Sequence, residues 1–82
     1  MKIRVLFFSV LRDATGHAET DRELPAGSTV KDLLEGLFQD WPALREWDPS
    51  LLLAVDHDYV VRRDIPLHEG AEVAVMPPVQ GG

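Results

Sequence analysis

The chain has 82 residues, 45% of them hydrophobic and 27% charged, and a formal net charge of −6. These values are typical of one small folded domain, and no apolar run approaches the ~20 residues that span a membrane. The negative net charge disfavours nucleic-acid binding and favours a partner with a basic surface. The absence of cysteine excludes disulfides, zinc–thiolate sites and a cysteine nucleophile. We therefore expect a cytoplasmic domain with no nucleic-acid or membrane partner.

The first quarter of the chain predicts two strands. Residues 2–8 alternate and are rich in β-formers, which indicates a strand. Its faces carry Ile3, Val5 and Phe7 on one side and Arg4, Leu6 and Phe8 on the other. Residues 9–15 form a connection with room for one helical turn. Acidic side chains at alternate positions of residues 17–24 predict an edge strand with one solvated face.

A helix follows, and it is the clearest element in the sequence. Apolar residues recur at helical spacing and form one stripe, composed of Val30, Leu33, Leu34, Leu37 and Phe38. Thr29 can cap the helix, with Asp32 completing a short variant of the capping box. The helix should end before Pro42, because a proline pushes the preceding residue out of the α region.

The second half predicts three more strands. In chain order we expect an apolar central strand (50–55), a turn (56–58), a return strand (59–61), a loop or single 3₁₀ turn (65–70) and a last strand (72–76). The order β-β-α-β-β-β indicates an α+β fold. Because one helix can cover only one face, we expect a mixed sheet with one main helix packed on one face.

The motifs of common catalytic and metal sites are missing. His17, His57 and His68 are far apart in sequence and have no metal-ligand spacing. We expect no metal and no cofactor bound by this chain. Trp41 and Trp47 are interpreted as lids over the core rather than as a ligand platform.

The face of the sheet turned away from the helix predicts a partner-binding patch. Leu6 and Phe8 in the first strand, and Ala74 and Met76 in the last, have the parity opposite to the apolar residues expected to meet the helix. A contiguous exposed apolar patch on a small domain usually marks a partner surface. The alternatives are that the two faces are inverted or that a loop covers the patch.

Residues 77–82 predict a flexible tail beyond a globular domain of residues 1–76. Prolines cannot donate to a sheet ladder, and Gly81 and Gly82 have no side chain, so this end could enter a narrow channel. The carboxylate of Gly82 could be activated as a mixed anhydride with AMP and passed to an amine or to a sulfur donor. Because the tail has no acid or base, catalytic groups must come from partners, and the chain alone is not catalytic. The alternative is an ordinary frayed terminus.

Four segments resemble the small subunit of molybdopterin synthase, a ubiquitin-like sulfur carrier. They are residues 6–13, 53–55, 66–74 and 77–82. The resemblance implies a β-grasp fold and a role in molybdenum cofactor biosynthesis. It implies that a ubiquitin-activating-enzyme-like adenylyltransferase uses ATP to adenylate Gly82, which then becomes a thiocarboxylate with sulfur from a donor system.

The resemblance also implies where the tail acts. The tail is inserted in the large subunit of molybdopterin synthase, where sulfur is transferred to cyclic pyranopterin monophosphate. The inserted residues are Pro78, Val79, Gln80, Gly81 and Gly82. The docking residues are those of the apolar patch.

Two positions depart from the family pattern. Gln80 stands where a small residue is usual, and Asp56 stands where asparagine is common. Three alternatives stay open: a sulfur carrier of thiamin thiazole synthesis, a ubiquitin-like protein modifier attached through Gly82, and an interaction domain whose tail does no chemistry.

Overall fold

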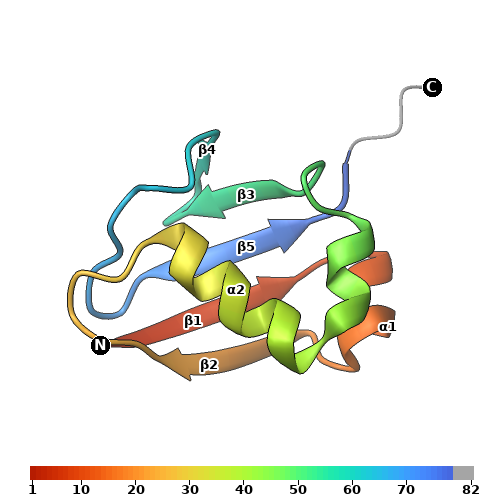
Figure 1. Cartoon of the computed structure of the whole chain (residues 1–82), viewed down its shortest axis with the longest axis horizontal. Coiled ribbons are helices and arrows are strands. Elements are labelled where there is room, and N and C mark those ends of the chain that lie inside the picture. Colours follow the sequence, from red (N-terminus) through yellow and green to blue (C-terminus); the bar gives the residue numbers. More distant parts are fainter. Residues whose placement is uncertain (79–82) are drawn as a thin grey trace.

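The computed structural model of the chain describes residues 1–78, and its five strands form one sheet with a helix packed on it (Figure 1). The elements in chain order are β1 (Lys2–Phe7), α1 (Val10–Thr15), β2 (Glu19–Glu23), α2 (Val30–Asp40), the 3₁₀ helix η1 (Pro42–Glu46), β3 (Leu52–Val55), β4 (Asp58–Val60) and β5 (Glu72–Met76). The predicted α+β class and the order of the main elements are confirmed.

The sheet is mixed, as predicted. Its strand order is β2-β1-β5-β3-β4, so the first and last strands of the chain are neighbours. β1 pairs parallel with β5 and antiparallel with the edge strand β2. β3 pairs antiparallel with both β5 and β4. Because β1 and β5 are parallel, they end at the same edge of the sheet, and the chain leaves β5 beside the end of β1 (Figure 1).

Helix α2 begins at the predicted cap. The Thr29 backbone N–H donates to Asp32 Oδ2 at 2.9 Å, and the Asp32 backbone N–H donates to Thr29 Oγ1 at 3.3 Å. These reciprocal bonds satisfy backbone groups that have no partner inside the helix. The helix ends at Asp40, two residues before Pro42, in agreement with the sequence prediction.

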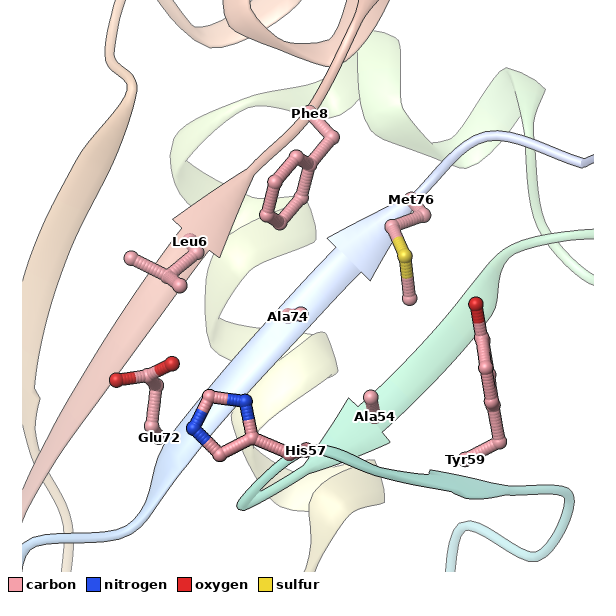
Figure 2. Close-up of a pocket in the computed structure, with 8 residues that line it drawn as sticks. All are labelled: Leu6, Phe8, Ala54, His57, Tyr59, Glu72, Ala74 and Met76. Carbon is pink, nitrogen blue, oxygen red and sulfur yellow. The ribbon is translucent and has the colours of Figure 1, made fainter.

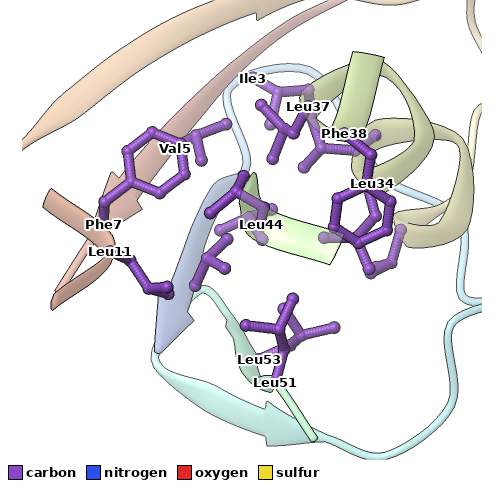
Figure 3. Close-up of a cluster of buried hydrophobic side chains, with 14 of the residues drawn as sticks. Ile3, Val5, Phe7, Leu11, Leu34, Leu37, Phe38, Leu44, Leu51 and Leu53 are labelled. Carbon is purple, nitrogen blue, oxygen red and sulfur yellow. The ribbon is translucent and has the colours of Figure 1, made fainter. Parts of the chain in front are cut away.

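The core lies between α2 and one face of the sheet (Figure 3). Ile3, Val5 and Phe7 are all buried, which confirms the predicted inner face of β1. Val73 and Val75 of β5 extend this layer and are also buried. Burying each such side chain stabilises the fold by about 1.5–3 kcal/mol. The core residues that pack on the sheet from the helices are Leu11, Val30, Leu33, Leu34, Leu37, Phe38 and Leu44.

Both tryptophans pack against the edge of this core, as the lid interpretation predicted. Trp41 and Trp47 are partly buried and contact the core cluster. The Trp41 ring meets the Phe7 ring edge-on, with centroids 5.5 Å apart. This T-shaped arrangement is one that aromatic pairs favour.

The hairpin between β3 and β4 differs from the prediction by one residue. Asp56 and His57 both have positive φ, 50° and 75°, which is typical of a two-residue type I′ turn. The turn therefore needs only two residues, and Asp58 joins β4. Val61, expected in the strand, lies outside it and is 99% exposed.

Other bounds differ as well. β1 ends at Phe7 rather than at residue 8, and β2 covers Glu19–Glu23 rather than residues 17–24. β3 begins at Leu52 rather than at residue 50, because its partner β5 ends at Met76, which lies opposite Leu52. The segment after β1 forms a six-residue helix, α1, which is longer than the single turn expected. Gly16 ends α1 at φ 76°, a conformation that glycine adopts without strain.

Candidate functional site

The sheet face opposite α2 carries a row of side chains that crosses four strands (Figure 2). Leu6 of β1 lies opposite Ala74 of β5, Ala74 lies opposite Ala54 of β3, and Ala54 lies opposite Tyr59 of β4. The small alanines in the middle of the row and larger side chains at both ends give this face a shallow concave shape. We call it the open face.

A second pair of side chains lies closer to the end of the sheet. Phe8 follows the last residue of β1, and its backbone N–H donates to the Val75 carbonyl at 3.3 Å. This bond keeps Phe8 in the ladder, so that its ring lies on the open face near Met76 (Figure 2). Phe8 is 37% exposed, whereas Phe7, on the other face, is 1% exposed.

The four residues predicted to form the patch therefore lie together. Leu6, Phe8, Ala74 and Met76 line one hollow of about 240 Å³. We call these four residues the docking patch. The same hollow is lined by four residues that the sequence prediction missed, namely Ala54, His57, Tyr59 and Glu72. The sequence could have predicted Ala54, because successive residues of a strand point to opposite faces and its neighbour Leu53 points into the core.

One border of the hollow contains an ion pair. His68 Nε2 lies 2.5 Å from Asp56 Oδ2, and His68 Nδ1 lies 2.9 Å from the Glu69 carbonyl oxygen. A protonated imidazole can donate to both acceptors at once, because each of its ring nitrogens then carries a proton. Asp56 Oδ1 also accepts the Glu72 backbone N–H at 3.0 Å.

These contacts shift both pKa values. The Glu72 backbone N–H, followed by His68, lowers the pKa of Asp56 from its ordinary value. The hydrogen bond to Asp56, followed by the contact with the Glu69 carbonyl, raises the pKa of His68. The pair connects the β3–β4 turn to the loop before β5 and so holds one border of the open face.

Charged residues follow the opposite border of the patch. Arg4 Nε donates to Glu19 Oε2 at 2.8 Å, and Lys2 Nζ lies 3.6 Å from Asp21 Oδ2. Arg12 of α1 instead places its guanidinium 5.9 Å from the centre of the Phe8 ring. This border therefore combines neutralised charges with one cation over an aromatic ring.

The chain passes from β5 towards the predicted tail at the end of the sheet. Pro77 and Pro78 line a hollow of about 350 Å³ together with Ser9, Val10 and Trp47. Among the residues predicted to be inserted in the partner, the structure places Pro78, which is partly buried. Val79, Gln80, Gly81 and Gly82 lie outside the described residues.

Within residues 1–78 no group of three or more histidine or acidic side chains is arranged to hold a metal ion. In the same part of the chain no helix is long and apolar enough to cross a bilayer.

Residues 5–82 match the ThiS family. The chain belongs to this family. Within it, the chain is 33% identical to the molybdopterin synthase sulfur carrier subunit of Arabidopsis thaliana, over all of this chain and 84% of that protein. It is 36% identical to the same subunit of Chlamydomonas reinhardtii, over the full length of both. The expected kinship with molybdopterin synthase sulfur carrier subunits is confirmed.

Solved structures agree with this assignment. A Pyrococcus furiosus protein assigned as molybdopterin converting factor, subunit 1, is 32% identical and superposes with a TM-score of 0.85, over 95% of this chain and 98% of that one. A chain of the complex of subunits 1 and 2 of molybdopterin-converting factor from Helicobacter pylori is 23% identical and superposes with a TM-score of 0.72, over the full length of both. This ThiS-family chain thus has the ubiquitin-like β-grasp fold that the resemblance implied.

Proposed function

We propose that the chain is the sulfur carrier subunit of a molybdopterin synthase and acts in molybdenum cofactor biosynthesis. The observation that carries this proposal is the full-length similarity to molybdopterin synthase sulfur carrier subunits. The family match also extends through Gly81 and Gly82. The runner-up functions share the fold, so the proposal depends on these relatives and on the chemistry of the chain end.

The proposed chemistry takes place at the carboxylate of Gly82. A carboxylate is a poor electrophile, since its charge repels nucleophiles. A ubiquitin-activating-enzyme-like adenylyltransferase joins it to the AMP part of ATP and releases pyrophosphate. A sulfur nucleophile from the donor system then forms the C–S bond as the C–O bond to AMP breaks. With a donor that supplies sulfur at the hydrosulfide level, the product is a thiocarboxylate. Its sulfur forms a C–S bond to the pterin precursor, and water then cleaves the acyl C–S bond and restores the Gly82 carboxylate. ATP is used by the partner and is not a resident cofactor of this chain.

The proposed partner for sulfur transfer is the large subunit of molybdopterin synthase. Ala74 and Met76 of the docking patch belong to β5, the strand that continues through Pro77 and Pro78 to residues 79–82. A partner bound to the open face would therefore hold the chain a few residues from Gly82. The Helicobacter pylori relative of the same fold, in complex with a second subunit, supports a partner of this kind. We propose that this assembly works in the cytoplasm.

The decisive experiment is intact-mass analysis of the purified chain incubated with the adenylyltransferase, ATP and the sulfur donor. We expect a mass gain equal to one oxygen-to-sulfur exchange at the chain end. Deleting Gly82 should abolish sulfur transfer while leaving the free energy of unfolding unchanged, because Val75 is the last core-cluster residue within the described residues 1–78. Sulfur transfer at the wild-type rate by the shortened chain would refute the mechanism.

Three outcomes separate the alternatives, from this experiment, from intact-mass analysis of the chain in its native host and from assays of sulfur transfer to each acceptor. Ladders of isopeptide-linked species in the native host would indicate a protein modifier. A thiocarboxylate that serves thiazole synthesis but not the pterin precursor would indicate the thiamin pathway. A chain that stays unmodified with all components present would indicate an interaction domain.

A further inference from the structure

Arg12 is the one cation bordering the docking patch that has no carboxylate partner within residues 1–78. Lys2 and Arg4, which also point to the open face, pair with Asp21 and Glu19. Arg12 forms no ion pair in this part of the chain. Glu19, which lines the same hollow as Arg12, is already bound to Arg4 by two hydrogen bonds.

The guanidinium of Arg12 is nevertheless held in place. Its Nε donates to the Phe7 carbonyl oxygen at 3.2 Å, and its Cζ lies 5.9 Å from the centre of the Phe8 ring. The first contact anchors the side chain to the end of β1, and the second is within the range of a cation–π interaction. The position of Arg12 is therefore tied to that of Phe8 in the docking patch.

Arg12 also lines a hollow of its own. This hollow, of about 230 Å³, shares Leu6 and Phe8 with the hollow that Met76 lines, and its further lining residues are Phe7, Ala18 and Glu19. Phe8 therefore lines both the hollow of the docking patch and one that contains a fixed cation. A guanidinium has five N–H donors, and Nε uses one of them here. The two terminal amino groups remain able to bind a carboxylate with both oxygens.

We propose that Arg12 is a specificity-determining contact of the docking patch and binds a carboxylate side chain of the large subunit. This proposal rests on the proposed function. The occupant of the hollow is a segment that pairs an acidic side chain with an apolar one that covers Phe8. The chain has a net charge of −6, which favours a partner that is basic overall. A single carboxylate that binds Arg12 then fixes the position of the partner segment on the docking patch. The other two cations on this border, Lys2 and Arg4, are already paired, and their acidic partners repel a further carboxylate.

The test measures the Kd of the full-length chain for its purified large subunit and, separately, for the purified adenylyltransferase by calorimetry, at low and high salt. The variants are Arg12→Gln, Arg12→Lys and Phe8→Ala. Arg45→Gln is the matched control, since Arg45 also lies over a phenylalanine ring, that of Phe38, on the helix-covered side and without an ion pair in residues 1–78. Melting temperatures of all variants check that they are folded.

We expect Arg12→Gln to weaken binding about tenfold or more and to reduce the salt dependence of Kd. Arg12→Lys should restore part of the affinity, because it keeps the charge but loses bidentate geometry. Arg45→Gln should bind as the wild type does.

Four results would overturn the proposal. If Arg12→Gln binds within twofold of the wild type while Phe8→Ala is weakened, the docking face stands and the role of Arg12 is refuted. If Arg45→Gln weakens binding as much as Arg12→Gln, the effect is one of net charge. If only binding to the adenylyltransferase is weakened, the occupant is the other partner. If the wild type does not bind the large subunit, the proposed function fails too.

Discussion

Phe7 and Phe8 are adjacent in sequence but have different environments. Phe7 is 1% exposed and packs in the core, whereas Phe8 is 37% exposed on the open face. We predict that Phe7→Ala lowers the free energy of unfolding by about 3–5 kcal/mol, the range for removing a buried aromatic side chain. Phe8→Ala should cost less stability but should weaken association with the large subunit. Urea denaturation and binding titrations measure the two effects.

This pair provides its own control, because the two substitutions remove the same atoms from neighbouring positions. A loss of stability in Phe8→Ala as large as that in Phe7→Ala would show that Phe8 belongs to the core and not to a docking surface. Equal binding by Phe8→Ala and the wild type would remove Phe8 from the docking patch.

The pair of His68 and Asp56 predicts a pH dependence of stability. The raised pKa of His68 means that its contribution is full below the ordinary histidine value of ~6.5 and is lost as the pH rises through the folded-state pKa. The lowered pKa of Asp56 means that its contribution is full above its ordinary value of ~3.9 and is lost as the pH falls through the folded-state pKa. The pair therefore stabilises the fold most in the window between these two ordinary values.

The measurement is the melting temperature at about pH 6 and about pH 9, on either side of the histidine titration. We expect the wild type to lose more stability between these pH values than His68→Gln does. His17→Gln is the control, since His17 forms no ion pair in residues 1–78, and it should behave as the wild type does. Identical pH profiles for the wild type and His68→Gln would show that the pair contributes nothing. Both side chains are exposed, so the expected difference is small.

The sequence could predict the environment of a single residue where the alternation of a strand decides on which face of the sheet its side chain lies. It assigned Ile3, Val5 and Phe7 to the core and Leu6 and Phe8 to the open face. It could not predict Tyr59 or His57 beside the patch, because their place depends on the register between β3 and β4 and on a turn with two positive φ values. The contact of Arg12 with the Phe8 ring likewise depends on how α1 folds back after β1.

At the scale of elements, α2 depends on its N-terminal cap. We predict that Thr29→Ala lowers the free energy of unfolding by about 0.5–2 kcal/mol, because it leaves the Asp32 backbone N–H without its acceptor. The measurement is chemical denaturation. Gln39→Ala, at an exposed position near the other end of α2, is the control and should change stability by less than about 0.5 kcal/mol. Equal effects of the two substitutions would contradict a role for the cap.

The elements that sequence predicted best are those whose limits are set by local chemistry. The cap at Thr29 and the prolines at 42 and 77 fixed the ends of α2 and β5 close to their observed positions. The start of β3 and the end of β4 were less accurate. Those limits are set by pairing with β5 and by the geometry of the hairpin turn, which are tertiary properties.

At the scale of the whole molecule, periodicity indicated one helix on one face of a mixed sheet but not the order of the strands. The parallel pairing of β1 with β5 brings together segments almost 70 residues apart, and no local pattern encodes it. The family resemblance supplied this topology. The docking patch depends on it, because Leu6 of β1 and Phe8 directly after β1 lie beside Ala74 and Met76 of β5.

The parallel pairing has a mechanical consequence. The described chain begins at the start of β1 and leaves β5 at the opposite end of the sheet (Figure 1). Tension between the two ends therefore acts along both strands in opposite directions, as shear. Under shear, the hydrogen bonds between β1 and β5 must break together rather than one after another. A pull on the chain beyond β5 would therefore load the parallel pairing of β1 and β5 in shear.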